Sequence, residues 1–159
     1  MAKGEHLVVV MLEPMPLDQE FEEWPLHITL VPWFPAKDKS KLDDLLAKIA
    51  GEHPKLKVTA GKKDIWGKRN QFEVNLINDP GGLHRLHWDV YHTLERNGFP
   101  IHQKEHLGDK YRPHFIYHPD NSVKKGDELS ISKFALIRQV RQKKTGRMIK
   151  AVAKEYNLK

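Results

Sequence analysis

Two histidines stand in short segments in which apolar and polar residues alternate, His27 in LHITLV and His114 in PHFIYH. An imidazole with its ordinary pKa of about 6.5 is populated in both protonation states near neutral pH, so two of them can serve as general base and general acid. Thr29 lies two residues after His27, which places its hydroxyl on the same face of a strand, where it can donate to a phosphate oxygen. These residues suit phosphoryl chemistry that needs no metal ion.

The segments around the two histidines repeat each other. Residues 24–32, WPLHITLVP, align without a gap on residues 111–119, YRPHFIYHP, so that an aromatic residue, the histidine and a proline coincide. Such a repeat implies two half-domains, each of which presents its histidine to a shared cleft while the alternate residues pack behind the strand. Trp24 and Tyr111, three positions before each histidine, should lie on the opposite face and belong to the core.

With these two motifs the chain resembles the two-histidine (2H) phosphoesterase superfamily, in particular its 2′-5′ RNA ligase-like and cyclic phosphodiesterase branch. The signature of that family is a pair of strands that each carry His-x-Thr/Ser. Residues 27–29 (HIT) match it in full, whereas residues 114–116 (HFI) lack the hydroxyl. The closing segment, residues 134–158, is also similar to the last strands of the family, so the resemblance covers nearly the whole chain.

The resemblance implies a bilobal α+β fold, in which two pseudo-symmetric halves of antiparallel sheet with a helix each flank a central groove. It also implies hydrolysis of 2′,3′-cyclic phosphates or related diesters at RNA ends, or the reverse ligation. By that analogy one histidine activates water or a hydroxyl and the other protonates the leaving ribose oxygen, with His114 favoured as base and His27 as acid. Thr29 would hold a non-bridging oxygen. The expected partners are RNA ends or small cyclic-phosphate nucleotides.

Ile116 occupies the position of the second hydroxyl, and a hydrocarbon side chain offers no donor to phosphate. His118 and Arg112 lie an even number of residues from His114, so a strand places both on the cleft face beside Ile116. His118 could supply the missing donor or stand at the rim of the cleft. Arg112 could contact phosphate or be a solvent-exposed strand end. We therefore take Thr29, Ile116, His118 and Arg112 as candidate substrate-binding residues.

The missing hydroxyl leaves a second function open, namely a non-catalytic module that binds RNA ends or nucleotides. The sequence favours the enzyme because both His27 and His114 are present, and a loss of catalysis need not preserve either. A different chemistry on a nucleotide or a phosphodiester cofactor is a third possibility.

Metal coordination is not expected. His114 and His118 are spaced like a metal-binding pair, but four residues along a strand separate them by about 13 Å, which is too far to share one ion. His84 and His87 lie at helical spacing and could chelate, but no cysteine supports them, and packing at the surface or in the core is the simpler interpretation. We assign no metal and no other cofactor.

The net charge of +6 and the pI of about 9.4 favour a polyanionic partner. Eight Lys or Arg residues lie between Lys133 and Lys154, with no Asp or Glu among them. This predicts one basic face, which either steers phosphates or is a solvated hairpin that protects a sheet edge. Trp66 with Lys68 and Arg69 can stack a nucleobase and contact phosphate, although core packing of Trp66 is an equal alternative.

The 159 residues, 39% of them hydrophobic, suit one domain over residues 1–159 with a core that needs no disulfide. Cysteine is absent, which excludes thiolate nucleophiles and cysteine-based zinc sites. The apolar run at residues 7–12 is too short for a signal sequence or a membrane span. We therefore expect a soluble, cytoplasmic protein that acts as a monomer.

Hydrophobic periodicity predicts the elements that position these residues. Helices are expected over Lys39–Ala50, between a cap at Asp38 or Ser40 and a stop at Gly51, and between Asp79 and Gly98. A loop is expected from Gly61 to Asn70. Alternation predicts strands at Leu7–Leu12, Leu26–Val31, Lys55–Ala60, Gln71–Ile77, Arg112–His118, Leu129–Gln142 and Arg147–Ala153. Helices that each follow strands, with short hairpin connections, predict an α+β fold of antiparallel sheets.

Overall fold

The computed structural model describes residues 6–159, and this part of the chain contains eight strands, two α-helices and one 3-10 turn. The helices are α1 (Lys39–Glu52) and α2 (Gly82–Arg96), and the 3-10 turn is Gly108–Lys110. The strands are β1 (His6–Met11), β2 (His27–Phe34), β3 (Leu56–Trp66), β4 (Phe72–Asn78), β5 (His114–Ile116), β6 (Glu128–Ile131), β7 (Lys133–Arg141) and β8 (Met148–Asn157).

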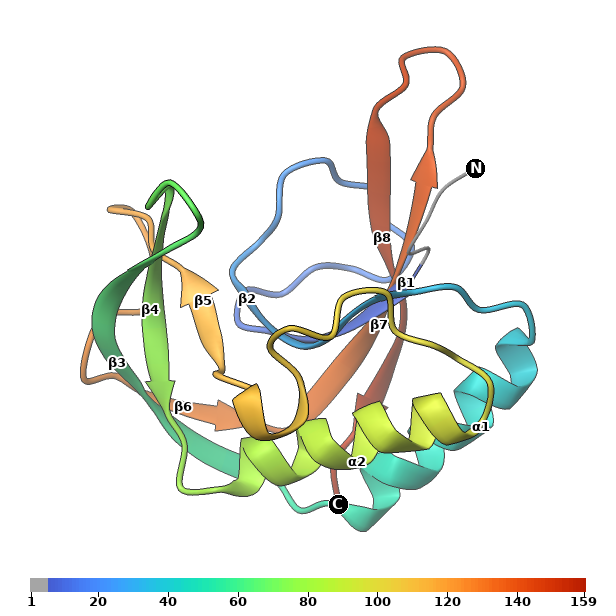
Figure 1. Ribbon diagram of the computed structural model, residues 1–159, viewed down its shortest axis with the longest axis horizontal. Coiled ribbons are helices and arrows are strands. Elements are labelled where there is room, and N and C mark those ends of the chain that lie inside the picture. Colours follow the sequence, from blue (N-terminus) through green and yellow to red (C-terminus); the bar gives the residue numbers. More distant parts are fainter. Residues whose placement is uncertain (1–5) are drawn as a thin grey trace.

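The strands form two four-stranded antiparallel sheets. The order is β2-β1-β7-β8 in one sheet and β5-β4-β3-β6 in the other. Figure 1 shows the two sheets side by side, with α1 and α2 packed together along one side of them. This arrangement confirms the predicted α+β class with two pseudo-symmetric halves. The two histidine strands, β2 and β5, take equivalent places, because each is an edge strand of its sheet.

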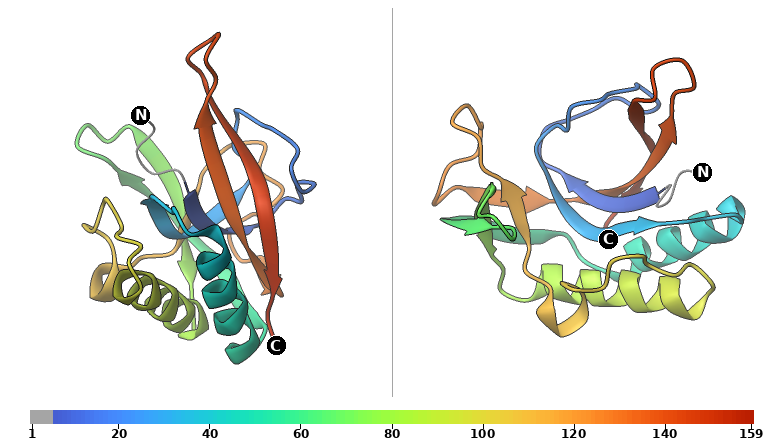
Figure 2. Two further views of the ribbon diagram at one scale, coloured as in Figure 1. Left: turned by 90° about the vertical axis from the view of Figure 1, so that its right-hand side faces the viewer. Right: turned by 45° about the horizontal axis from the view of Figure 1, so that its top comes forward.

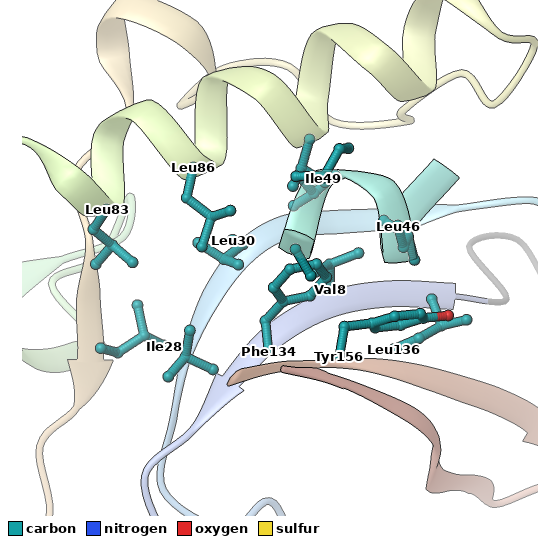
Figure 3. Packing of buried hydrophobic residues seen from close by; sticks show 14 of the residues in the cluster. Val8, Ile28, Leu30, Leu46, Ile49, Leu83, Leu86, Phe134, Leu136 and Tyr156 are labelled. Carbon is teal, nitrogen blue, oxygen red and sulfur yellow. The ribbon is translucent and has the colours of Figure 1, made fainter. Parts of the chain in front are cut away.

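One large apolar core lies between the sheets and the helices. Ile28 and Leu30 of β2 point into it toward α2, which contributes Leu83 (Figure 3). All three side chains are inaccessible to solvent. Because alternate residues of a strand face opposite sides, this core contact turns His27 and Thr29 away from the helices.

A smaller apolar cluster covers the other face of the β2-β1-β7-β8 sheet. Leu7 and Val9 of β1 pack there with Phe21, which belongs to the connection between β1 and β2. The backbone of Phe21 pairs with that of Lys150 in β8. The connection therefore crosses the sheet from β1 to β8 before it returns to β2.

Helix α1 begins as predicted, because Asp38 Oδ1 accepts a hydrogen bond from the amide of Lys41. It does not stop at Gly51, as the sequence suggested, but continues to the residue before His53. His53 has φ −111° and ψ 134°, the extended conformation that a following proline imposes. Pro54 therefore ends the helix, and Gly51 is an ordinary helical residue.

Three predicted strand boundaries are wrong. Strand β3 runs to Trp66 through a bulge at Gly61, where a Cβ atom would lie 2.9 Å from the carbonyl oxygen of Leu76. Glycine permits this close approach, so it marks a bulge within the strand rather than the start of a loop. The predicted strand 129–142 is two strands, β6 and β7, that belong to different sheets. Strand β5 is shorter than the predicted strand 112–118.

Candidate active site

Strands β2 and β5 are in contact where the edges of the two sheets meet, and each begins with one of the two histidines. His27 and His114 are half-buried, whereas Ile28 and Phe115, the residues that follow them, are buried in the core. The alternation of each strand therefore turns both histidines away from the core.

The two imidazoles are held in the same way. Nδ1 of His27 lies 2.9 Å from the carbonyl oxygen of Pro25, and Nδ1 of His114 lies 2.9 Å from that of Arg112. Because a carbonyl oxygen can only accept, Nδ1 carries a proton in both rings. A neutral ring then has an unprotonated Nε2 that can accept a proton, and a charged ring can donate one from the same atom.

Each histidine also lies beside a tryptophan. The ring centroids of Trp24 and His27 are 4.2 Å apart, and so are those of Trp66 and His114. The predicted core position of Trp24 is only half right, because this residue packs against the smaller apolar cluster but stays half-buried next to His27. Tyr111, its counterpart in the repeat, is buried as predicted. In the second half of the protein, Trp66 from β3 takes the place that Trp24 has in the first.

Burial lowers the pKa of both histidines. For His27 the loss of hydration outweighs the hydrogen bond to the Pro25 carbonyl, which favours the charged form, and the charge of His114 lowers the pKa further. For His114 burial is again the largest cause, opposed by the bond to the Arg112 carbonyl and reinforced by the charges of His106 and Arg112. Protonation of one ring therefore discourages protonation of the other. The state in which both imidazoles are charged is therefore disfavoured.

The six predicted site residues line two adjoining cavities, which together we call the groove. One cavity, of about 290 Å³, is lined by three of them, Thr29, Arg112 and His114. The other, of about 480 Å³, is lined by the remaining three, His27, Ile116 and His118. The cavities adjoin, because residues two apart on one strand line one cavity each: His27 and Thr29 on β2, and Ile116 and His114 on β5. The structure thus brings together all six residues that the sequence singled out.

Arg112 and Trp66 form part of the wall on the His114 side. The Arg112 guanidinium lies 3.6 Å from the carboxylate of Asp64 and 5.1 Å from the centroid of the Trp66 ring. The indole N–H of Trp66 donates to Asp64 Oδ2 at 3.0 Å, and this bond lowers the pKa of Asp64. Trp66 lines a cavity of about 390 Å³ with Phe72 and His106. Of the two interpretations of Trp66, core packing is therefore wrong.

Sequence reasoning missed His106. It lies in the loop before β5, where no regular period predicts a direction for a side chain. The structure places it in the wall of the groove, with its ring centroid 6.3 Å from that of Trp66. Lys68 and Arg69, which the sequence associated with Trp66, are exposed in the β3–β4 turn and line none of these cavities.

A buried pair of rings supports the groove from behind. His87 of α2 donates from Nδ1 to the Leu30 carbonyl at 2.7 Å and accepts at Nε2 from the Gly108 amide at 2.9 Å. Its ring stacks on Tyr111 at 3.9 Å, and the Tyr111 hydroxyl donates to the Thr29 carbonyl at 2.8 Å. Burial lowers the pKa of His87 to about 4. The neutral ring therefore ties β2 to the loop that precedes β5.

A family model described as the 2′-5′ RNA ligase superfamily matches residues 9–115, about two-thirds of the chain, including both histidines. The chain belongs to this superfamily. The match confirms the resemblance to two-histidine phosphoesterases that the paired motifs predict.

Several solved structures share the fold at low sequence identity. A crystal structure titled as a phosphoesterase is 16% identical, with 99% of each chain covered and a TM-score of 0.64. A protein of Thermus thermophilus is 16% identical over 97% of each chain, with a TM-score of 0.65. E. coli LigT complexed with 3′-AMP is 16% identical over 99% of each chain, with a TM-score of 0.62. No curated protein matches the chain significantly in sequence.

The basic residues between 133 and 154 do not form the single face that the sequence predicted. Lys150 is buried and lies over the ring of Trp24. Figures 1 and 2 show that the β7–β8 hairpin, with Lys143 and Lys144 in its turn, projects from the body of the molecule. Four of the eight residues pair with carboxylates: Lys133 with Glu155, Arg138 with Asp18, Arg147 with Glu22 and Lys154 with Asp43.

Residues 6–159 contain no helix that is both long and apolar enough to cross a membrane. In the same part of the chain, no three histidine, aspartate or glutamate side chains are grouped as a metal site would require. His84 and His87, which are spaced for chelation, use both ring nitrogens within the fold. Those of His84 contact Asp79 and the Tyr111 carbonyl, and those of His87 bond to backbone.

Proposed function

We propose that this member of the superfamily hydrolyses 2′,3′-cyclic phosphates or related diesters at RNA ends, or catalyses the reverse ligation, as a cytoplasmic monomer. His27 and His114 act as the acid–base pair, and no metal ion takes part. The observation that carries the proposal is the matched setting of the two rings. Each donates from Nδ1 to the carbonyl two residues earlier, and neither Nε2 has a hydrogen-bond partner among residues 6–159.

Hydrolysis of a cyclic phosphate requires two proton transfers. The neutral imidazole accepts a proton at Nε2 from water as the water oxygen attacks phosphorus. The charged imidazole gives its Nε2 proton to the ribose oxygen as the bond from that oxygen to phosphorus breaks. In ligation a ribose hydroxyl takes the place of water. The preferred assignment has His114 as base and His27 as acid.

In this proposal the two histidine strands contact the phosphate differently. The Thr29 hydroxyl supplies a donor in the cavity that contains His114. On the other side, Ile116 offers only van der Waals contact, and His118 is the neighbouring side chain that can donate to a phosphate oxygen. Arg112 is exposed and only loosely paired with Asp64 at 3.6 Å, so its guanidinium can turn toward a bound phosphate at little cost.

Small cyclic-phosphate nucleotides and RNA ends are the proposed substrates. Crystal structures of E. coli LigT contain 3′-AMP, NADP+ or ATP, which supports a nucleotide as the ligand of the shared fold. The cavities beside His27 and His114 have volumes of about 480 and 290 Å³, a size that suits a nucleotide.

Binding without catalysis is the second candidate function. Ile116, where the family signature has a hydroxyl, is the observation that favours it. Such a protein would keep the groove and its affinity for nucleotides but would lack turnover.

The test is incubation of the purified full chain with a 2′,3′-cyclic mononucleotide in the presence of EDTA, with the 2′- and 3′-monophosphate products separated. The proposal predicts many turnovers per protein molecule and a single product isomer. Nucleotide binding without turnover would favour the second candidate. Activity that EDTA abolishes and a divalent cation restores would contradict the metal-free mechanism.

A further inference from the structure

A further cavity opens beside the groove, on the other side of His118. It has a volume of about 370 Å³, and His118 lines both this cavity and the one that contains His27. Asn75, Tyr117 and Val123 contribute to its wall. The remaining wall residues are four lysines, Lys62 and Lys63 from β3 and Lys124 and Lys125 from the β5–β6 loop. We call this cavity the lysine pocket.

The backbone around the lysine pocket is anchored. The β3 lysines follow the bulge at Gly61, whose carbonyl accepts a hydrogen bond of 3.1 Å from the buried Asn75 side chain. The β5–β6 loop is fixed at both ends. The Asn121 side chain donates to the Ile116 carbonyl at 3.1 Å, and the Gly126 amide donates to the Ala60 carbonyl at 2.8 Å. The four lysines therefore surround a cavity that the fold itself shapes.

The positive charge of the lysine pocket is only weakly opposed by carboxylates, of which Asp64 is near enough to interact with Lys62. In the described part of the chain, none of its four ammonium groups forms an ion pair with a carboxylate. The Lys63 ammonium lies 4.2 Å from the centroid of the Tyr117 ring, and that of Lys124 donates to the Pro119 carbonyl at 3.2 Å. The basic residues of the β7–β8 hairpin differ, since half of them are ion-paired. A concave surface lined by charge of one sign attracts ligands of the opposite sign.

We propose that the lysine pocket binds backbone phosphates of a single-stranded polynucleotide whose end occupies the groove. The inference rests on the proposed function of the groove and names its substrate class. Because His118 borders both cavities, a chain that leaves the groove past His27 enters the lysine pocket. A mononucleotide fills the groove alone, whereas an oligonucleotide fills both.

The experiment measures the Kd of a fluorescent single-stranded RNA hexamer with a 3′-phosphate, by anisotropy, between 50 and 200 mM salt. The proteins are the wild type, Lys63→Gln/Lys125→Gln, the charge-preserving Lys63→Arg/Lys125→Arg and the control Lys143→Gln/Lys144→Gln at the hairpin turn. Turnover of a 2′,3′-cyclic mononucleotide is measured separately for each protein.

Each phosphate contact adds about 0.7 to the slope of log affinity against log salt for a single strand. Loss of two contacts should therefore lower the slope by about 1.4, so that raising salt fourfold weakens the wild type about sevenfold more than Lys63→Gln/Lys125→Gln. The arginine variant and the hairpin control should keep the wild-type slope. Turnover of the mononucleotide should be the same in all four proteins.

Equal slopes in the wild type and Lys63→Gln/Lys125→Gln would overturn the inference, and so would an equal loss in the hairpin control, which would indicate a diffuse electrostatic effect. A wild type that binds the hexamer no better than a mononucleotide would overturn it as well. These outcomes are distinct from a failure of the proposed function, which would appear as no turnover of the mononucleotide by the wild type.

Discussion

Ile116 is the residue at which the chain departs from the signature of its family, and its replacement is predicted to raise enzymatic activity. Its side chain is 50% exposed and lines the cavity that contains His27. Ile116→Thr replaces the ethyl branch by a hydroxyl, keeps the β-branched shape that suits a strand and introduces a donor where the family has one. If phosphate binds between β2 and β5, this variant should be a better enzyme than the wild type.

The size of the gain follows from the exposure of the site. A hydrogen bond to a charged group contributes about 1.5–3 kcal/mol. Because residue 116 is half exposed to solvent, the bond from its new hydroxyl to phosphate should lie at the lower end of this range. About 1.5 kcal/mol in the transition state corresponds to roughly a tenfold rise in kcat/KM. The cost in stability is small, because the half-buried methylene and methyl groups that are lost contribute together about 0.8 kcal/mol.

The assay is kcat/KM on a 2′,3′-cyclic mononucleotide for the wild type, Ile116→Thr, His118→Ala and the double variant. Ile65→Thr is the matched control, since Ile65 is 56% exposed in the same sheet but lines none of the cavities described above. If His118 already donates to the phosphate, His118→Ala should harm the wild type more than it harms Ile116→Thr. An active enzyme that neither Ile116→Thr nor His118→Ala changes would refute the position of the phosphate.

Burial lowers the pKa of both His27 and His114. A plot of kcat/KM for a cyclic mononucleotide against pH should therefore be bell-shaped, with its maximum below about pH 6.5. Both rings are charged on the acid side of this maximum and both are neutral on its alkaline side. A bell centred above pH 7 would contradict this. His87 has a pKa of about 4 in the folded protein and about 6.5 in the unfolded chain, so between these two pH values the unfolded chain binds a proton that the folded protein does not. The contribution of His87 to the free energy of unfolding is therefore complete above pH 6.5 and falls by up to about 3 kcal/mol as the pH drops to 4. Urea unfolding should show a smaller loss over this range for His87→Gln than for the wild type, and equal losses would mean that His87 titrates normally. Tyr111→Phe removes the donor to the Thr29 carbonyl and should lower the free energy of unfolding by about 1 kcal/mol; an unchanged urea midpoint would show that this carbonyl finds another partner.

The parts of the fold that the sequence predicts well are those in which periodicity and burial agree, such as α1 and β2. The errors arise where a local rule for glycine competes with tertiary context. Gly51 resembles a helix stop, but the helix ends where Pro54 forces His53 into extended backbone. Gly61 resembles the start of a loop, but it sits in a bulge because another backbone approaches it closely.

Some residues of the candidate site can likewise be predicted from the sequence and others cannot. The repeat and the two-residue period of a strand are enough to predict that His27, Thr29, His114 and Ile116 face one groove, because side-chain direction in a strand follows from position alone. Trp66, His106 and the four lysines of the lysine pocket lie outside the repeat. Their places depend on a bulge and on loop paths, for which the sequence carries no period.

The central claim is that His27 and His114 act together as acid and base, and the most direct test is kcat/KM on a 2′,3′-cyclic mononucleotide for His27→Ala, His114→Ala and the double variant. His102→Ala is the control, since that side chain is exposed and lines none of the cavities described above. Each single variant should fold and lose about 10²-fold or more in kcat/KM, and the double variant should lose much less than the product of the two losses, because the residues work as a unit. The control should match the wild type. Near wild-type turnover by either folded single variant would contradict the claim.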